Sequence, residues 1–329
     1  MWAYVLRRVL YAVPVYLGIV LLLMVALRLP GDPAVAFLGK NADAEQLETI
    51  RRNLGLDRPF IVQYLSFLGQ VVTLDFSGSE SWDQPGRTVG ELFASAIGPS
   101  LALTVPALVL TAVTSIAVGL ISAYFRGRLL DRTLMVLIVL GMSISVLVFI
   151  VLGQYFGAYW LKGALGREIF ATGGYEPLFF GGPERPADPA NWVRYCMLPV
   201  MISVVVAVGY DTRFYRAVMV EECTRDYITT ALAKGADKPR VMLVHMLKNA
   251  MIPVITRVMM TLPFLVTGSI LLERYFRIPG MGRLLLEAIA HKDFPVIQAF
   301  TALFALLFIA TNILTDVLYA LVDPRVKLA

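Results

Sequence analysis

The stretch RDYITTALAKGADKPRVMLVHMLKN, from Arg225 to Asn249, lies between two long apolar runs and carries seven charged side chains. It has too many charges to cross a bilayer, because one charged group at the bilayer centre costs about 2.5–3.5 kcal/mol on insertion scales. Its apolar residues nevertheless recur at helical spacing. The stretch therefore predicts a helix, a glycine turn and a second helix that connect two membrane spans.

The composition around this stretch is typical of a membrane protein. Of the 329 residues, 58% are hydrophobic and 16% are charged, and the mean hydropathy is +0.71. Soluble domains carry about 25% charged residues. The net charge of +5 is spread among apolar runs rather than gathered on one domain, so we expect no nucleic-acid partner. The two cysteines, Cys196 and Cys223, lack metal-ligand spacing and are expected to be packing residues.

Six apolar runs predict an all-α polytopic membrane protein with six transmembrane helices. They cover residues 9–27, 92–125, 133–161, 195–210, 249–272 and 294–315, and the last continues to about residue 322. The second helix is expected to begin near Pro99, because proline fits a first helical turn. The AVA sequence at 34–36 resembles the cleavage site of a signal peptide. The first run is longer than the apolar core of a typical signal peptide, however, so we expect it to be an uncleaved helix.

The basic residues predict the orientation of these spans, since lysine and arginine gather in cytoplasmic loops. We expect both termini to be cytoplasmic, and the stretch from Arg225 to Asn249 would then also face the cytoplasm. The cytoplasmic segments would hold these basic residues: Arg7, Arg8, Arg126, Arg128, Arg132, Arg213, Arg216, Arg225, Lys234, Lys238, Arg240, Lys248, Arg325 and Lys327.

Local signals divide the charged stretch into two helices. Asp226 is expected to cap a helix over 227–234, and Gly235 is expected to end it in a left-handed conformation. Asp237 would cap a second helix that has Pro239 in its first turn and feeds the fifth span.

Two interpretations of the first of these helices are open. It can lie on the inner leaflet as an amphipathic helix, or it can dock as a short rigid helix into a groove of another protein. Ala231, Ala233 and Ala236 would keep its surface small enough for the close approach that docking needs.

The motifs along the chain together resemble the permease subunits of bacterial ABC importers, in their dipeptide and oligopeptide branch. The EAA loop of that branch usually has the form Tyr-x-x-Thr-Ala-x-Ala-Lys-Gly, and this chain reads Tyr-Ile-Thr-Thr-Ala-Leu-Ala-Lys-Gly over 227–235. The other matching motifs are LPGDP at 29–33, GLDRPFIVQYLSFL at 55–68, ERYFRIPGMGRLLLEAI at 273–289, and N-x-x-x-D-x-x-Y from Asn312 with DPR at 323–325. The segment TLDFSGS at 73–79 departs from the usual Gly-Asp-Leu-Gly-x-Ser.

The resemblance implies a type I ABC importer permease in the bacterial plasma (inner) membrane, with an ATPase-coupling helix. The coupling residues it implies are Tyr227, Thr230, Ala231, Ala233, Lys234, Gly235 and Ala236. The implied partners are a second homologous permease, two ATPase subunits and an extracytoplasmic substrate-binding protein. The implied cargo is a small peptide. The chain has no phosphate-loop motif, so we expect it to be no enzyme and to hold no cofactor, with ATP and Mg²⁺ on the ATPase subunits.

The resemblance also divides the chain into regions. Residues 1–96 would form the first transmembrane helix and the extracytoplasmic loop region, residues 97–322 the transmembrane core with the coupling loop at 213–249, and residues 323–329 a cytoplasmic tail. The outer loop over 31–91 could pack against the outer membrane surface, contact the binding protein, or do both.

Alternative functions differ in the features they require. The same architecture could import a nickel chelate or glutathione. A secondary transporter would need no docking helix and would show inverted repeats, which the sequence does not show. An intramembrane enzyme would need a catalytic cluster, and none is visible.

A few polar residues within or near the spans call for separate interpretation. Arg257 could meet a substrate carboxylate, pair with an acid of a partner subunit, or extend to the interface. Asp211 and Arg213 are expected to be structural and to pair with each other. Asn312 and Asp316 are four residues apart, on one helix face, and are expected to pack between helices.

Overall fold

The computed structural model describes residues 2–29, 32, 34–35, 43–53, 56–178, 188–267 and 269–322, and every named element within them is a helix. The elements are α1 (Trp2–Ala26), α3 (Ala44–Asn53), α4 (Phe60–Thr73), α5 (Val89–Tyr124), α6 (Leu129–Ser143), α7 (Val146–Leu152), η1 (Gly153–Trp160), α8 (Leu161–Leu165), α9 (Pro189–Glu222), α10 (Asp226–Ala233), α11 (Lys238–Arg240), η2 (Val241–Met246), α12 (Leu247–Thr267), α13 (Ile270–Tyr275), α14 (Met281–His291) and α15 (Phe294–Val322).

Six segments of the described chain are long and apolar enough to cross a membrane, which is the expected number. They are Leu6–Ala26, Val89–Tyr124, Val146–Leu165, Pro189–Glu222, Lys238–Tyr275 and Phe294–Leu318. Parts of the LPGDP motif, and the DPR motif with the tail at 323–329, lie outside the described residues.

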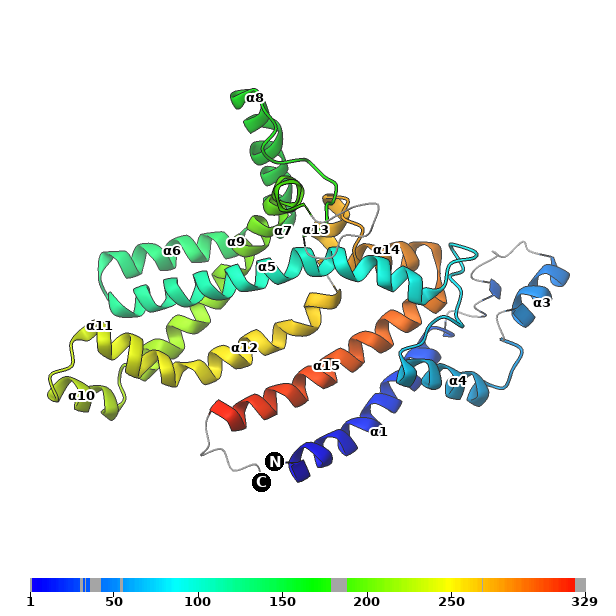
Figure 1. Cartoon of the computed structure of the whole chain (residues 1–329), viewed down its shortest axis with the longest axis horizontal. Coiled ribbons are helices and arrows are strands. Elements are labelled where there is room, and N and C mark those ends of the chain that lie inside the picture. Colours follow the sequence, from blue (N-terminus) through cyan, green and yellow to red (C-terminus); the bar gives the residue numbers. More distant parts are fainter. Residues whose placement is uncertain are drawn as a thin grey trace.

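The long helices run side by side, and short helices lie at the two ends of the assembly or, like α7 and α8, project from its middle (Figure 1). Helix α5 packs along α9, α12 packs against α15 and α5, and α1 packs against α15. Figure 1 shows α10 and α11 at one end of the assembly and α3 and α4 at the other. The start of α1 and the end of α15 lie next to each other, where Arg8 Nε is 2.8 Å from Asp316 Oδ2. This ion pair gives Asp316 the helix-packing role expected for it, whereas Asn312 is exposed.

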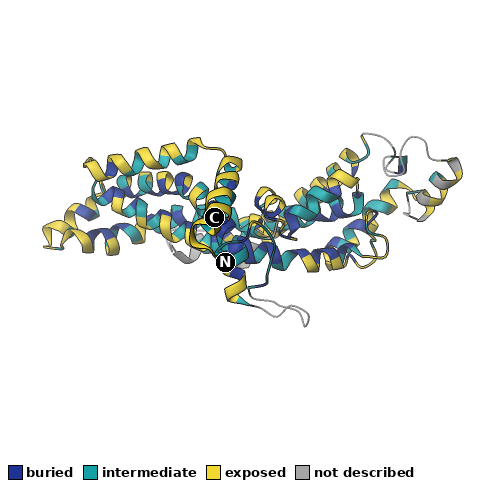
Figure 2. Cartoon of the chain, turned by 90° about the horizontal axis from the view of Figure 1, so that it is seen from above, coloured by how far each residue is buried: buried dark blue, intermediate teal, exposed yellow. Residues whose placement is uncertain are grey.

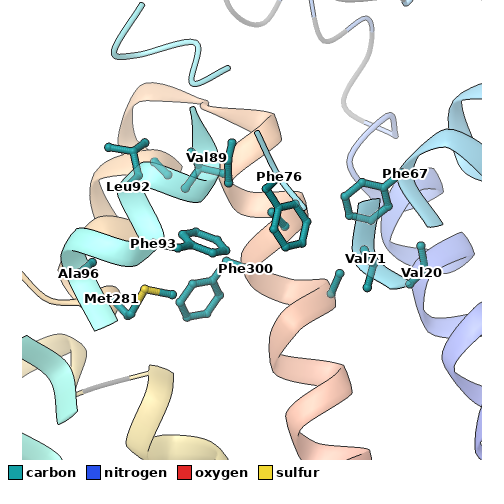
Figure 3. Close-up of a cluster of buried hydrophobic side chains, with 14 of the residues drawn as sticks. Val20, Phe67, Val71, Phe76, Val89, Leu92, Phe93, Ala96, Met281 and Phe300 are labelled. Atoms are coloured by element: carbon teal, nitrogen blue, oxygen red, sulfur yellow. The ribbon is translucent and has the colours of Figure 1, made fainter. Parts of the chain in front are cut away.

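Three clusters of buried apolar side chains hold the helices together. The first joins α1, α4, α14 and α15 to the beginning of α5, and Figure 3 shows Phe93 facing Phe300 within it. The second joins the middle of α5 to α7, α9 and α13, and includes Cys196. The third lies at the opposite end of α5 and includes α10 and η2. Many residues on the outer faces of the helices are exposed, as Figure 2 shows, and large apolar side chains are among them on α1, α6 and α7.

The second span begins ten residues earlier than expected. Helix α5 starts at Val89, and Thr88 and Glu91 form a capping box in which each side chain accepts from the backbone N–H of the other. Such a box satisfies two N–H groups that a helix start otherwise leaves unpaired. Pro99 therefore lies inside α5 rather than at its start. The expectation that the helix begins near Pro99 was wrong.

The expected third span, 133–161, is not one helix. Helix α6 ends at Ser143, Ile144 is extended, and the Ser145 side chain accepts from Leu147 N–H at 3.4 Å at the start of α7. Serine side chains compete for backbone hydrogen bonds in this way and favour helix ends. The candidate span consequently begins at Val146, after the break.

A buried carboxylate ties α13 and α14 to α5 at the end that carries α3 and α4. Glu273 is fully buried, and it accepts hydrogen bonds from Ser100 Oγ at 2.8 Å and from Arg283 N–H at 2.9 Å. Gly280 lies so close that an added Cβ would stand 2.5 Å from the Glu273 carboxylate and 2.6 Å from Ser100 Oγ. A side chain at position 280 would therefore overlap these groups and destabilise the fold.

Candidate functional site

The helix α10 begins one residue earlier than its capping signal suggested. Arg225 occupies the N-cap position, and Asp226 is the first residue of the helix rather than its cap. The Asp226 carbonyl oxygen accepts from Thr229 Oγ1 at 2.7 Å and from Thr230 Oγ1 at 2.9 Å. An acidic residue in the first turn still suits the positive end of the helix dipole. The expectation of an Asp226 cap was therefore wrong by one position.

The end of α10 is a left-handed glycine turn, as the sequence predicted. Gly235 has φ +84°, its N–H donates to Leu232 O at 2.9 Å, and the next N–H, of Ala236, donates to Ala231 O at 3.1 Å. These two bonds form the Schellman motif that commonly ends a helix. No atom lies within 4 Å of a Cβ added to Gly235, so a larger residue there would be strained by its backbone conformation and not by a clash.

The second helix of the stretch continues without interruption into the fifth span. Elements α11, η2 and α12 follow one another from Lys238 to Thr267, with Asp237 at the N-cap position but without a side-chain capping bond. Lys238 Nζ donates to Tyr124 O at 2.9 Å and lies 4.3 Å from the centre of the Tyr124 ring. A cation at the last turn of α5 is favourable, since that end of a helix is negative. This contact fixes the turn to the end of α5.

The two faces of α10 have different surroundings. Tyr227, Ile228 and Ala231 pack into the third apolar cluster together with Ala236. Tyr227 Oη also donates to Glu222 Oε2 at 2.5 Å, and burial, followed by this bond, raises the pKa of Tyr227 to about 12. The opposite face is exposed and carries Thr229, Thr230, Leu232, Ala233 and Lys234.

This arrangement separates the predicted coupling residues into two groups. Thr230, Ala233, Lys234 and Gly235 are accessible to another protein. Tyr227, Ala231 and Ala236 are partly buried against their own chain. Leu232, which the sequence analysis did not single out, is 49% exposed and is the large apolar side chain on the accessible face.

A network around Asp131 joins the helix ends beside this segment. Arg216 of α9 donates from Nε to Asp131 Oδ1 and from Nη2 to Asp131 Oδ2, both at 2.8 Å. Ser122 of α5 also donates to Asp131, and Gly127 N–H donates to it at 2.9 Å. The hydrogen bonds from Arg216 hold the pKa of Asp131 well below its usual range, so the pair stays ionised at neutral pH. The sequence did not predict this network, because Arg216 lies 85 residues from Asp131 although Ser122 and Gly127 are near it along the chain.

Arg257 has an ion-pair partner within its own chain. Its Nε lies 2.8 Å from Asp211 Oδ1, which links α12 to α9. The expected pairing of Asp211 with Arg213 was therefore wrong, and Arg213 forms no ion pair among the described residues. The Asp211 side chain is 12% exposed and that of Arg257 is 40% exposed. Any substrate carboxylate or partner acid that met Arg257 would have to share it with Asp211.

Comparison with known proteins identified two family matches. Residues 115–328 match the family described as binding-protein-dependent transport system inner membrane component. Residues 1–95 match the family described as the N-terminal part of a binding-protein-dependent transport system membrane component.

Individual proteins resemble the chain along nearly its whole length. One from Brucella suis biovar 1 (strain 1330), named "Putative peptide permease protein", is 36% identical over 330 residues, which cover 99% of both chains. The glutathione transport system permease protein GsiC of Salmonella choleraesuis (strain SC-B67) is 36% identical over 326 residues, which cover 98% of both chains.

The ion pair between Asp211 and Arg257 generates a prediction. We expect Arg257→Gln alone to destabilise the chain by roughly 1–3 kcal/mol, because it leaves a largely buried acceptor without its partner. Asp211→Asn combined with Arg257→Gln should recover most of that loss, and thermal unfolding of the four proteins in detergent measures it as a double-mutant cycle. If Arg257 also meets the cargo, the double variant will recover stability but not transport. Strictly additive losses would contradict the pairing.

Proposed function

The chain belongs to the family of binding-protein-dependent transport system inner membrane components, and we propose that it forms part of the translocation pathway for small peptides in an ATP-driven importer. Family membership makes it an inner-membrane permease component and not a catalytic subunit. Such a system works with a binding protein and an ATPase. In our proposal these are an extracytoplasmic binding protein and two ATPase subunits, which bind ATP and Mg²⁺, and a second, homologous permease completes the pathway.

The exposed face of α10 is the observation that carries this proposal. An amphipathic helix that lies on a leaflet turns its apolar face to the lipid. The apolar face of α10 is already packed against its own chain, and its outer face is small and mostly polar apart from Leu232. A short helix with such an outer face suits a groove in another protein better than it suits lipid. We therefore place the ATPase contact at Thr230, Ala233, Lys234 and Gly235.

The helix α10 is connected to the spans in a way that can transmit displacement. It is joined through the Gly235 turn to a helix that runs unbroken from Lys238 to Thr267. Its inner face packs against α5, α9 and η2 in the third cluster. Packed interfaces shift as units rather than deforming continuously. Movement of ATPase subunits at α10 would therefore move α12 and α9, between which Asp211 and Arg257 form their ion pair.

The cargo is proposed from the similar proteins. The Brucella protein is named as a peptide permease and the Salmonella protein as a glutathione permease, and glutathione is itself a tripeptide. We propose small peptides as the cargo of this chain, with glutathione as the second candidate. Both termini are cytoplasmic in this proposal, as the basic residues of the loops suggest.

The coupling role predicts a specific defect for Gly235→Val. A β-branched residue at φ +84° is strained by about 1–2 kcal/mol, which changes the population of the ordered turn by about 5- to 30-fold. The variant should reach the membrane normally but lose ATPase subunits on purification, or keep them without peptide-stimulated ATP hydrolysis. Gly235→Asn should retain coupling, because asparagine tolerates the left-handed conformation.

The chain offers a matched control for this experiment. Gly86 also has φ +84°, is exposed and has no atom within 4 Å of an added Cβ, but it lies in the loop between α4 and α5. Gly86→Val should carry the same strain and still couple normally. Normal ATPase retention and stimulation in Gly235→Val would refute the docking role of α10.

The cargo proposal is tested separately by competition. In membranes that contain the complete transport system, unlabelled di- to pentapeptides should reduce the uptake of a labelled tripeptide. Glutathione should compete only weakly if ordinary peptides are the cargo. Strong competition by glutathione alone would replace the peptide proposal with the second candidate and leave the coupling role untouched.

A further inference from the structure

A cavity of about 580 Å³ lies between α1, α4 and α15, at the end of the spans opposite α10 (Figure 1). The loops before and after α4 complete its lining. Its volume is within the range of about 300–1,000 Å³ that is usual for small-molecule sites. In the proposed orientation the cavity is on the extracytoplasmic side, where the cargo arrives.

The end of the cavity at the start of α4 is positively charged. Arg28 Nη2 donates to Gln63 Oε1, and Gln63 Nε2 donates to Arg58 O at 2.7 Å, so both arginines are held at the same glutamine. Neither arginine forms an ion pair within the part of the chain that the structure describes, whereas Arg52, which also lines the cavity, pairs with Glu48. Guanidinium groups bind carboxylates through paired, charge-assisted hydrogen bonds. This end therefore has the chemistry of a carboxylate site.

The other end of the cavity carries an acidic side chain. Glu80 lines the cavity and forms no ion pair among the described residues. It follows Ser79, whose Oγ donates to Gln70 Oε1 at 2.9 Å, and its backbone pairs with that of Thr88 in an isolated bridge. These contacts hold Glu80 beside the last turn of α4. A carboxylate at this place attracts a cationic group such as an ammonium.

The distance between the two ends is set by α4, because a residue of this helix contacts each of them. Gln63 at the positive end and Gln70 at the acidic end are seven residues apart, which is about 10 Å along the helix axis. An extended chain spans about 3.3–3.6 Å per residue, so the termini of a tripeptide are separated by a similar distance. A zwitterionic tripeptide therefore matches the cavity in both charge and length.

The cavity also has apolar side chains that can receive a peptide side chain. Phe67 stands between Gln63 and Gln70 on the same face of α4 and is 8% exposed. Trp82 and Phe294 line the cavity as well, and their ring centroids are 5.3 Å apart. An apolar peptide side chain that covers these rings leaves water, which is favourable. The cavity thus suits a tripeptide whose central side chain is apolar.

We propose that this cavity binds a zwitterionic peptide of about three residues, with its carboxylate on Arg28 and Arg58 and its ammonium at Glu80. The central side chain of the peptide packs on Phe67. The site holds the peptide at the outer end of the chain before the peptide enters the pathway. The choice of a peptide as ligand rests on the proposed function, while its length and charges follow from the cavity.

Equilibrium dialysis of the labelled tripeptide Ala-Phe-Ala against the full-length chain in mild detergent tests this proposal. The free tripeptide should bind, and its C-terminal amide and its N-acetyl form should each bind about fivefold more weakly, the upper range for one exposed ion pair. Equal binding of the three peptides, or no binding of the free one, would overturn the proposal.

Variants of the chain assign each terminus of the peptide to one end of the cavity. Arg58→Gln should weaken the binding of Ala-Phe-Ala about fivefold and leave that of its amide unchanged, because the amide has no carboxylate to lose. Glu80→Gln should weaken the free tripeptide in the same way and leave the N-acetyl form unchanged. Arg58 and Glu80 are exposed, so both variants should fold.

Two control variants leave the cavity lining intact. Arg87→Gln removes an arginine that bonds to Gln84 outside the lining, and Asp75→Asn removes an exposed acid of the same loop. Both should bind Ala-Phe-Ala like the unaltered chain. Unchanged binding of Ala-Phe-Ala in Arg58→Gln or in Glu80→Gln would contradict the assignment of its termini.

A last comparison separates the peptide from a soluble anion. Inorganic phosphate at the same concentration should not displace Ala-Phe-Ala, because phosphate can occupy only the positive end. Displacement by phosphate would assign the cavity to an anion and overturn the proposal. Failure of this site is distinguishable from failure of the proposed function, since the chain is tested here without its transport partners. Peptide import by the complete system with equal binding of the capped peptides would reject this site alone, and selective binding without import would reject the proposed cargo alone.

Discussion

The bidentate ion pair between Asp131 and Arg216 is the constraint on which the functional end of the molecule depends. The Asp131 side chain is only 5% exposed and accepts hydrogen bonds from α9, from α5 and from the backbone turn between α5 and α6. A carboxylate in such a place is stable only while these donors are present, since breaking one partner of a buried pair costs about 3–5 kcal/mol. The pair therefore fixes the ends of three helices relative to one another, and two of these ends, those of α5 and α9, pack with α10 and η2 in the third cluster.

The helix α10 packs on this surface, and the turn that follows it is fixed to the end of α5. Lys238 joins the turn after α10 to the end of α5, and the Gly235 turn sets the direction of the chain between α10 and the fifth span. The face of α10 that remains accessible is small, mostly polar and continuous with the turn. At the opposite end of the spans, Glu273 ties α13 and α14 to α5 through a second buried carboxylate. Each end is thus held by a polar network together with an apolar cluster.

The sequence predicts the features that depend on neighbours along the chain. Apolar runs gave six spans, and Gly235 followed by Ala236 gave a left-handed helix end, because hydropathy and turn conformation are local properties. The Thr88 capping box is also local, since Thr and Glu stand three residues apart, and it marks the start of α5 better than the proline at position 99 does. The arginine partners of Asp131 and Asp211 could not be predicted, since they lie 85 and 46 residues away and are brought close only by helix packing. The same holds for the division of α10 into a packed face and an accessible face.

Photo-crosslinking from the accessible face of α10 tests the central claim most directly. A photoreactive amino acid at Thr230 in membranes that contain the complete transport system should form an adduct with an ATPase subunit, and the adduct should vanish when the ATPase subunits are stripped from the membrane. The same probe at Ile61, which is 58% exposed at the opposite end of the spans, should form no ATPase adduct. A Thr230 probe that reacts only with lipid, with the ATPase subunits present and active, would contradict the assignment of α10 as the coupling helix.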